Sequence, residues 1–313
     1  MTNLSEFTFL SSDGKTQLHG MLWEPEGVAV RAVLQICHGV AEHIARYDGF
    51  ARALNEQGIV VAGHDHLGHG KSLPEGGTPV YFGQGSTWNT VVDDIYVLHP
   101  RLTQRDPAVP QSLMGHSMGS FLTRTYLIRY PGTVKAAVIM GTGWQPQAAI
   151  TGGLALANAI ADVSGENAAR ELVTELAFGS YNKLFAPNRT KVDWLSADES
   201  NVDDYIADPL CGADATVGLF RQMLHGIRFN QRQSHLRQMD REMPVLFVAG
   251  DKDPVGSCGK GVRQTYDAFR AAGMRDCTLK LYPGLRHEIL NEKAYTADIT
   301  KNIEAWLLSR LEK

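Results

Sequence analysis

Short apolar runs of strand length alternate with amphipathic helical patterns along most of the 313-residue chain, which restricts the possible folds sharply. The runs are apolar nearly throughout, as expected for parallel strands buried on both faces. The predicted strands are Ala32–Cys37, Ile59–Ala62, Ser112–Met114, Val134–Met140, Val245–Ala249 and Thr278–Tyr282. This alternation predicts an α/β protein with a mostly parallel central sheet and helices on both faces.

Helical patterns fill the spaces between these strands. They lie near Tyr47–Gln57, Trp88–Gln104, Ser120–Arg129 and Val262–Ala272. The C-terminal helix is the clearest, because Ile299, Ile303 and Trp306 recur on one face at helical spacing. The N-terminal segment differs, since Phe7–Leu10 and Gln17–Leu22 flank a Ser-Asp-Gly turn. That pattern predicts an antiparallel hairpin at the sheet edge.

Residues 144–240 break the rhythm, with only helical and irregular patterns. No linker or low-complexity tract separates this region from its surroundings. We therefore predict an inserted helical cap at 144–240 on a single core formed by 1–143 and 241–313. The small apolar run Ala148–Ala161 is too rich in Gly and Ala to anchor strongly, so we expect at most transient membrane-surface contact through the cap.

Composition excludes several classes of function. A net charge of −4 gives no basic footprint for nucleic acid. The four cysteines show no C-x-x-C spacing, which favours a reducing compartment. The N-terminus lacks the basic start and apolar run of a signal peptide, and no apolar stretch reaches the roughly 20 residues of a membrane span. These observations predict a cytoplasmic location.

Gly115-His116-Ser117-Met118-Gly119 is the motif that carries chemistry. It follows a predicted strand and precedes a predicted helix, which is the context of a G-x-S-x-G nucleophile elbow. The glycines permit a tight turn that exposes the serine hydroxyl, and the helix start behind it offers N–H groups to an oxyanion. Ser117 is the predicted nucleophile.

A serine hydroxyl needs an oriented base. If the partners follow in the order Ser, Asp, His, then His287 is the base, because it is the only histidine after His235. The acid should follow the preceding strand, where both Asp251 and Asp253 lie. Chemistry alone does not separate these two aspartates, since either could reach an imidazole N–H and the other could tighten the turn.

The second oxyanion donor should come from the loop after an early strand. Ala32–Cys37 ends in His38-Gly39-Val40, where glycine lets the backbone approach a substrate closely. We expect the N–H groups of Val40 and Met118 to form the oxyanion hole. His38 is predicted to support this loop rather than transfer protons.

Four segments together resemble one known family. They are HGVAEHIARYDGFARALNEQGIVVAGHDHLGHGKS (38–72), GHSMGS (115–120), AGDKDPVG (249–256) and LYPGLRHEILNE (281–292). Their sequences and order resemble the monoacylglycerol lipase and lysophospholipase group of the α/β-hydrolase superfamily, also called serine aminopeptidase S33-type hydrolases. The resemblance spans nearly the whole core but does not extend to specific residues of 144–240.

The resemblance implies an α/β-hydrolase fold and a Ser117–Asp253–His287 triad, because the family's acid lies three residues after the glycine that is Gly250 here. It also places the oxyanion donors on Val40 and Met118. It implies a supporting rather than catalytic role for Glu42, His43, Arg46 and the Asp65–His69 turn.

Two competing motifs fail. His64, His66 and His69 have the spacing of an H-x-H-x-D-H zinc signature, but Gly68 stands where its aspartate should be. Gly259-Lys260 lacks the Ser or Thr of a P-loop, because Gly261 follows. We therefore predict no metal and no cofactor. We expect Asp93-Asp94 to be solvated. The aromatic residues of 144–240 are individually expected to be packing residues rather than substrate contacts: Trp144, Trp194, Phe178 and Tyr181. Collectively, an apolar cap over the serine would still suit an acyl pocket.

Three functions follow in order of preference. The first is a serine hydrolase that cleaves a small-molecule acyl ester through an acyl-enzyme, with a monoacylglycerol, lysophospholipid or simpler ester as substrate. The second is an aminopeptidase-like amide hydrolase, which needs cap carboxylates to hold an amine: Glu166, Glu171, Glu175, Asp193, Asp198 and Asp203 are the candidates. The third is a non-catalytic binding module, which usually lacks a triad member.

Overall fold

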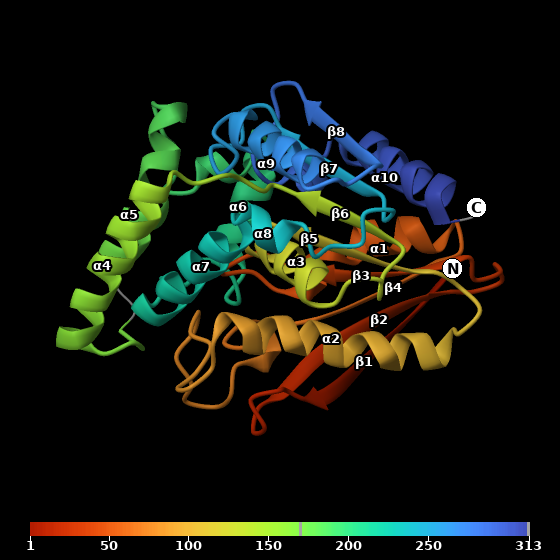
Figure 1. Cartoon of the computed structure of the whole chain (residues 1–313), viewed down its shortest axis with the longest axis horizontal. Helices are drawn as coiled ribbons and strands as arrows, with labels where there is room; N and C mark the ends of the chain where they lie inside the picture. Colours follow the sequence, from red (N-terminus) through yellow and green to blue (C-terminus); the bar gives the residue numbers. More distant parts are fainter. Residues whose placement is uncertain (169–170, 312–313) are drawn as a thin grey trace.

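The computed structural model describes residues 1–168 and 171–311 (Figure 1). Within these residues lies an eight-stranded sheet in the order β1-β2-β4-β3-β5-β6-β7-β8. The strands are β1 (Thr2–Leu10), β2 (Gln17–Pro25), β3 (Ala32–Cys37), β4 (Ile59–His64), β5 (Gln111–His116), β6 (Ala136–Met140), β7 (Val245–Gly250) and β8 (Cys277–Tyr282). β1 and β2 pair antiparallel with each other and β2 with β4, whereas the strands from β4 to β8 are parallel.

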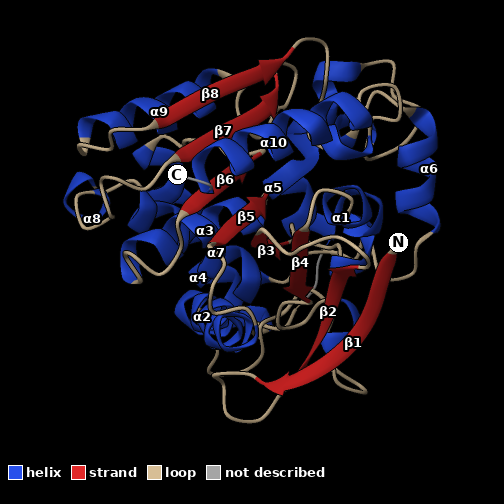
Figure 2. Cartoon of the chain, turned by 90° about the vertical axis from the view of Figure 1, so that its right-hand side faces the viewer, coloured by secondary structure: helices blue, strands red, loops and turns tan. Residues whose placement is uncertain are grey.

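Helices cover both faces of this twisted sheet (Figure 2). They are α1 (Asp48–Asn55), α2 (Trp88–Arg105), α3 (Met118–Arg129), α4 (Gln147–Ser164), α5 (Glu171–Asn182), α6 (Glu199–Ala207), α7 (Val217–Asn230), α8 (Gln233–Leu236), α9 (Lys260–Ala271) and α10 (Thr296–Leu311). Side chains of β3 alternate between two cores, as the two-residue period of a strand requires. Val33 and Cys37 belong to the core that includes residues of α2, α3 and α9, while Leu34 and Ile36 belong to the core that includes residues of α1 and α10.

Residues 144–240, which we call the inserted segment, lie between β6 and β7 in sequence. Their described part holds α4 to α8 and short 3-10 helices, and no strand. In Figure 1, α4 and α5 stand away from the sheet, whereas α7 lies beside α3. Asn230 of α7 accepts the hydroxyl hydrogen of Thr125 at 2.8 Å and donates to the carbonyl of Phe121 at 2.8 Å. The segment is thus held on the sheet's helical layer mainly through α7.

The sequence located these elements closely. The predicted parallel strands and the N-terminal hairpin are all present, and the predicted helices differ from the observed ones by a few residues at their ends. One prediction is wrong: Asp94 is buried rather than solvated. Its carboxylate accepts the Ser11 hydroxyl at 3.0 Å and the Ser12 amide at 2.6 Å, and burial raises its pKa to about 6.

Crossing a bilayer requires a helix that is both long and strongly apolar. None of the helices in the described ranges meets both requirements.

Candidate active site

Ser117 stands at the junction between β5 and α3 in a strained backbone conformation, with φ 54° and ψ −119°. Few residues other than glycine adopt positive φ, and such strain is typical of functional sites. The flanking glycines allow the turn. A Cβ on Gly119 would lie 2.0 Å from the carbonyl oxygen of Cys37, and one on Gly115 would lie 2.1 Å from the carbonyl oxygen of Gly119. The sequence G-x-S-x-G is therefore a steric requirement of this junction.

The structure brings His287 to Asp253. The Nδ1 atom of His287 lies 2.9 Å from Oδ1 of Asp253, and the two side chains are 2% and 0% exposed. The N–H of Val255 donates to the same carboxylate oxygen at 2.9 Å. Asp251 does something different, since its Oδ1 accepts the N–H of Gly284 at 2.8 Å and so tightens the turn after β8. Geometry thus separates two aspartates that composition left equivalent.

The other imidazole nitrogen of His287, Nε2, is buried and has no hydrogen-bond partner among the described residues. His287 and Ser117 both line one cavity of about 790 Å³, a size within the range of small-molecule binding sites. The side chain that carries this unpaired nitrogen therefore borders the same cavity as the strained serine.

The loop after β3 runs against the serine. A Cβ on Gly39 would lie 2.6 Å from Oε1 of Glu42 and 3.1 Å from the Cβ of Ser117, so any larger residue here would force its neighbours to shift. Val40 lines the cavity. Neither the Val40 amide nor the Met118 amide has a hydrogen-bond acceptor within residues 1–168 and 171–311. His38 supports the loop, because its Nε2 accepts the N–H of His66 at 3.0 Å.

A buried charged network lies beneath this loop. Glu42 accepts the N–H of Gly39 and lies 2.9 Å from Arg46 and 3.2 Å from Nδ1 of His116. Arg46 also pairs with Glu288 at 2.7 Å. Burial favours the neutral form of His116, but the hydrogen bond to Glu42 and the nearby carboxylates outweigh it and raise its pKa. The network fixes the position of Gly39, and thereby of the loop next to Ser117.

Aromatic side chains of the inserted segment stand over His287. Trp194 lies with its ring 5.1 Å from that imidazole and, like Phe178, lines the cavity. Tyr181 packs against Trp194 at 5.2 Å without lining the cavity, and neither does Trp144. Trp194 and Phe178 thus pack against each other and also border the cavity. Sequence reasoning missed further lining residues for lack of a local motif: Leu195, Tyr205 and Asn182 are examples.

The acidic residues proposed to hold a substrate amine do not converge. Among the described lining residues, only Glu171 and Glu175 of the six border the cavity, together with Lys183 and Lys191. Lys191 lies 2.6 Å from Glu171 and offsets its charge. The other four bind protein groups: Glu166 pairs with Arg221, Asp193 accepts from Thr190, Asp198 accepts from the Ser200 amide, and Asp203 pairs with Arg189.

The two histidines of the Asp65–His69 turn, His66 and His69, are buried beside His38 and His64. The His66 ring lies 4.2 Å from that of His38 and 5.0 Å from that of His64, measured between centroids. Burial lowers the pKa of His64 to about 3 and that of His69 to about 4. These rings are neutral packing groups behind the loop that carries Val40.

The comparisons with known proteins identify the family. A family model described as "Serine aminopeptidase, S33" matches residues 28–294. The chain belongs to this family. A monoacylglycerol lipase of Mycolicibacterium smegmatis is 31% identical over 312 residues, which cover 98% of this chain and 98% of the relative. Human monoglyceride lipase is 29% identical over 304 residues, covering 96% of this chain and 89% of that one.

Solved structures agree with this family assignment. A thermostable carboxyl esterase from Bacillus coagulans, in complex with glycerol, superposes with a TM-score of 0.92 at 25% identity, over 99% of this chain and 100% of that chain. A lipase in its open form superposes with a TM-score of 0.89 at 26% identity, over 99% of each chain. This S33-family member therefore has the α/β-hydrolase fold across its whole length.

Proposed function

We propose that this chain is a serine hydrolase that cleaves monoacylglycerols or similar simple acyl esters. The observation that carries the proposal is the buried His287–Asp253 pair. Nε2 of His287 has no hydrogen-bond partner among the described residues, and His287 lines the same cavity as the strained Ser117. Its relatives named as monoacylglycerol lipases and the carboxyl esterase that superposes on it support the same chemistry. The chain is a carboxylic ester hydrolase, and the glycerol ester is the finer proposal.

The reaction runs in two halves. His287 takes the proton of Ser117 as its oxygen attacks the ester carbonyl, and Asp253 holds the imidazole in the required tautomer. The amides of Val40 and Met118, which have no acceptor among the described residues, stabilise the oxyanion. His287 then protonates the leaving alcohol, which leaves an acyl-enzyme on Ser117. Water repeats the sequence and releases the acid.

The inserted segment acts as a cap in this proposal. Its residues Phe178, Trp194 and Leu195 provide apolar surface close to His287, which suits an acyl chain. Of the five carboxylates that border the cavity, Glu171 pairs with Lys191, and Glu42 and Glu288 both pair with Arg46, so most of its negative charge is already offset. This charge balance favours ester over aminoacyl amide. The proposal places the enzyme in the cytoplasm, where its four free thiols would stay reduced.

Substrate preference tests the proposal. The measurement is kcat/KM on p-nitrophenyl esters and monoacylglycerols of increasing acyl length, compared with aminoacyl anilides. We expect hydrolysis of the esters and of monoacylglycerols, with anilides cleaved far more slowly. A preference for anilides would establish the aminopeptidase-like function instead. Activity on short esters without activity on any monoacylglycerol would support the esterase activity but reject monoacylglycerol as the substrate.

Labelling tests the nucleophile separately. A fluorophosphonate should modify the wild-type protein at Ser117 and leave Ser117→Ala unlabelled, while Ser120→Ala, whose hydroxyl donates to the Ser117 carbonyl at 2.6 Å, should still be labelled. Folded wild-type protein that takes up no label would support a non-catalytic binding module. A chelator should leave hydrolysis unchanged, because no step requires a metal ion.

A further inference from the structure

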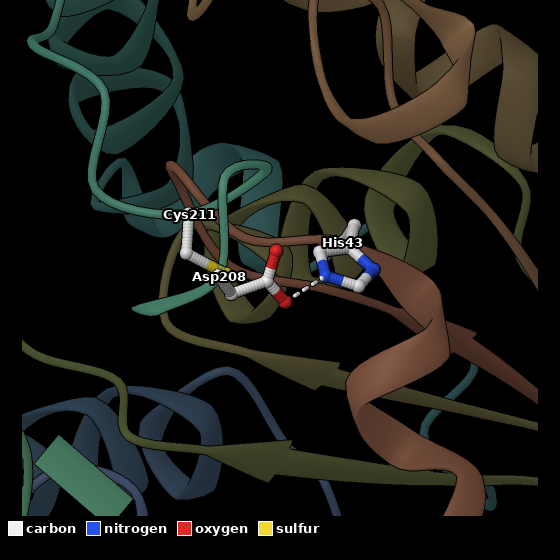
Figure 3. A group of neighbouring side chains, drawn as sticks. All are labelled: His43, Asp208 and Cys211. Carbon is white, nitrogen blue, oxygen red and sulfur yellow. Dashed lines mark hydrogen bonds and ion pairs between the residues drawn. The ribbon is translucent and has the colours of Figure 1, made fainter. Parts of the chain in front are cut away.

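Three potential metal ligands from distant parts of the chain meet outside the cavity (Figure 3). His43 follows the loop after β3, whereas Asp208 and Cys211 lie just after α6. The Nε2 atom of His43 lies 2.8 Å from Oδ2 of Asp208, and Figure 3 shows the carboxylate between the imidazole and the thiol. The ligand atoms of all three residues lie within 4.8 Å of one another. No local motif indicates this group, because His43 and Asp208 are 165 residues apart.

The backbone fixes the two ligands of the second segment. The amide of Leu210 donates to Oδ1 of Asp208 at 2.9 Å, and the amide of Cys211 donates to the Asp208 carbonyl at 3.0 Å. These bonds form a tight turn that leaves Oδ2 directed at His43. The loop that carries His43 is fixed to the same turn, since the amide of Gly212 donates to the Ala41 carbonyl at 3.0 Å. These hydrogen bonds therefore hold the three potential metal ligands close together in the absence of an ion.

We propose that His43, Asp208 and Cys211 form a site for a zinc-class divalent cation, completed by water. An imidazole nitrogen, a carboxylate oxygen and a thiolate sulfur are the donor types that Zn²⁺ takes, and three protein ligands leave one position for water. The Asp208 side chain is 28% exposed, so an ion can enter from solvent. The proposal does not rest on the esterase reaction.

Nearby charges do not oppose the ion strongly. Arg46 is a charged neighbour of Cys211, but it pairs with Glu42 at 2.9 Å and with Glu288 at 2.7 Å. Burial raises the pKa of the Cys211 thiol, so at neutral pH the ligand is protonated before the ion arrives. Binding therefore exchanges the thiol proton for a sulfur–zinc bond and releases one proton to the buffer. An occupied site would join the inserted segment to the loop that carries Val40, in addition to the hydrogen bonds that Gly212 and Tyr205 donate to the Ala41 carbonyl.

Calorimetric titration with Zn²⁺ on the intact protein tests the site, with Co²⁺ as a spectroscopic substitute. We expect one equivalent to bind wild type and raise its Tm, and the cobalt form to show a sulfur-to-cobalt charge-transfer band. Cys211→Ser and Asp208→Asn should weaken zinc at least about tenfold, and Cys211→Ser should lose the band. Cys258→Ser, which alters an exposed thiol elsewhere, is the matched control and should behave as wild type.

Unfolding curves recorded without metal establish that each variant is folded before its affinity is compared. Wild type that binds no zinc would overturn the proposal. So would equal affinity in wild type and folded Cys211→Ser, or a cobalt spectrum without a sulfur band, because the ion would then lie elsewhere.

Discussion

Nδ1 of His287 lies 2.9 Å from Oδ1 of Asp253, and both side chains are almost wholly inaccessible to solvent. Asn at position 253 would present an amide that accepts from or donates to the imidazole with equal ease, so the required tautomer would be lost. We therefore expect Asp253→Asn to lower kcat about ten-thousandfold on a p-nitrophenyl ester. Asp251→Asn is the matched control and should be mild, because Asp251 accepts the Gly284 amide rather than pairing with His287. Equal losses in the two variants would refute the assignment of the acid.

The elbow glycines give a second prediction. A methyl group on Gly119 would lie 2.0 Å from the Cys37 carbonyl oxygen, and this neighbour is rigid strand backbone. Gly119→Ala should therefore lower the midpoint of urea unfolding and abolish labelling by a fluorophosphonate. Gly152 of α4 has no heavy atom within 4 Å of its virtual Cβ, so Gly152→Ala should stabilise by about 0.5–1 kcal/mol through helix propensity. If Gly119→Ala keeps wild-type stability, the junction is looser than its contacts imply.

The sheet could be predicted because its signal is local and redundant. Strands such as Val245–Gly250 are buried on both faces and therefore apolar throughout, and each lies next to a helix with a clear apolar side. The elbow at Ser117 was equally predictable, because its glycines are required by contacts within a few residues of the motif and with β3. For the acid, the residues alone left Asp251 and Asp253 open, and only the resemblance favoured Asp253.

Long-range contacts carried no such signal. Asp94 looks like a solvated helix carboxylate until the turn at Ser11 and Ser12 supplies its hydrogen bonds. Phe178 and Trp194 are of residue types that usually pack in a core, so the sequence alone does not distinguish them from core residues. The placement of the inserted segment over His287 brings them to the cavity. The domain boundaries at 143 and 241 stay predictions, as do the roles of Val40 and Met118.

Arg46 provides a prediction on stability. Its side chain is 11% exposed and lies between the carboxylates of Glu42 and Glu288, which are 5% and 3% exposed. Arg46→Met would leave the buried Glu288 without its cation and Glu42 with His116 alone, at a cost of about 3–5 kcal/mol in the free energy of unfolding. Urea denaturation measures this. Arg52→Met removes the exposed partner of Asp48 and should change little, since exposed pairs contribute little. Similar losses in the two variants would contradict the buried network.

The histidines behind the loop after β3 predict how stability depends on pH. Burial lowers the pKa of His64 to about 3, that of His69 to about 4 and that of His66 well below its usual range. In the unfolded chain these rings take up protons near pH 6.5. Their contribution to stability is therefore fully present above pH 6.5 and is lost as the pH falls toward the folded-state values. His116, whose pKa is raised, acts in the opposite direction.

A single substitution isolates one ring from these opposing effects. Neither nitrogen of His64 has a partner among the described residues, and its ring packs edge-on against Phe9 at 5.2 Å. His64→Leu should therefore keep nearly the wild-type free energy of unfolding at pH 7.5, because no hydrogen bond is lost. Between pH 6.5 and 5, its stability should fall less steeply than that of wild type, by about 1.4 kcal/mol per pH unit. Urea denaturation across this range measures both curves. Parallel curves would mean that His64 is protonated in the folded protein and that its burial does not exclude the charge.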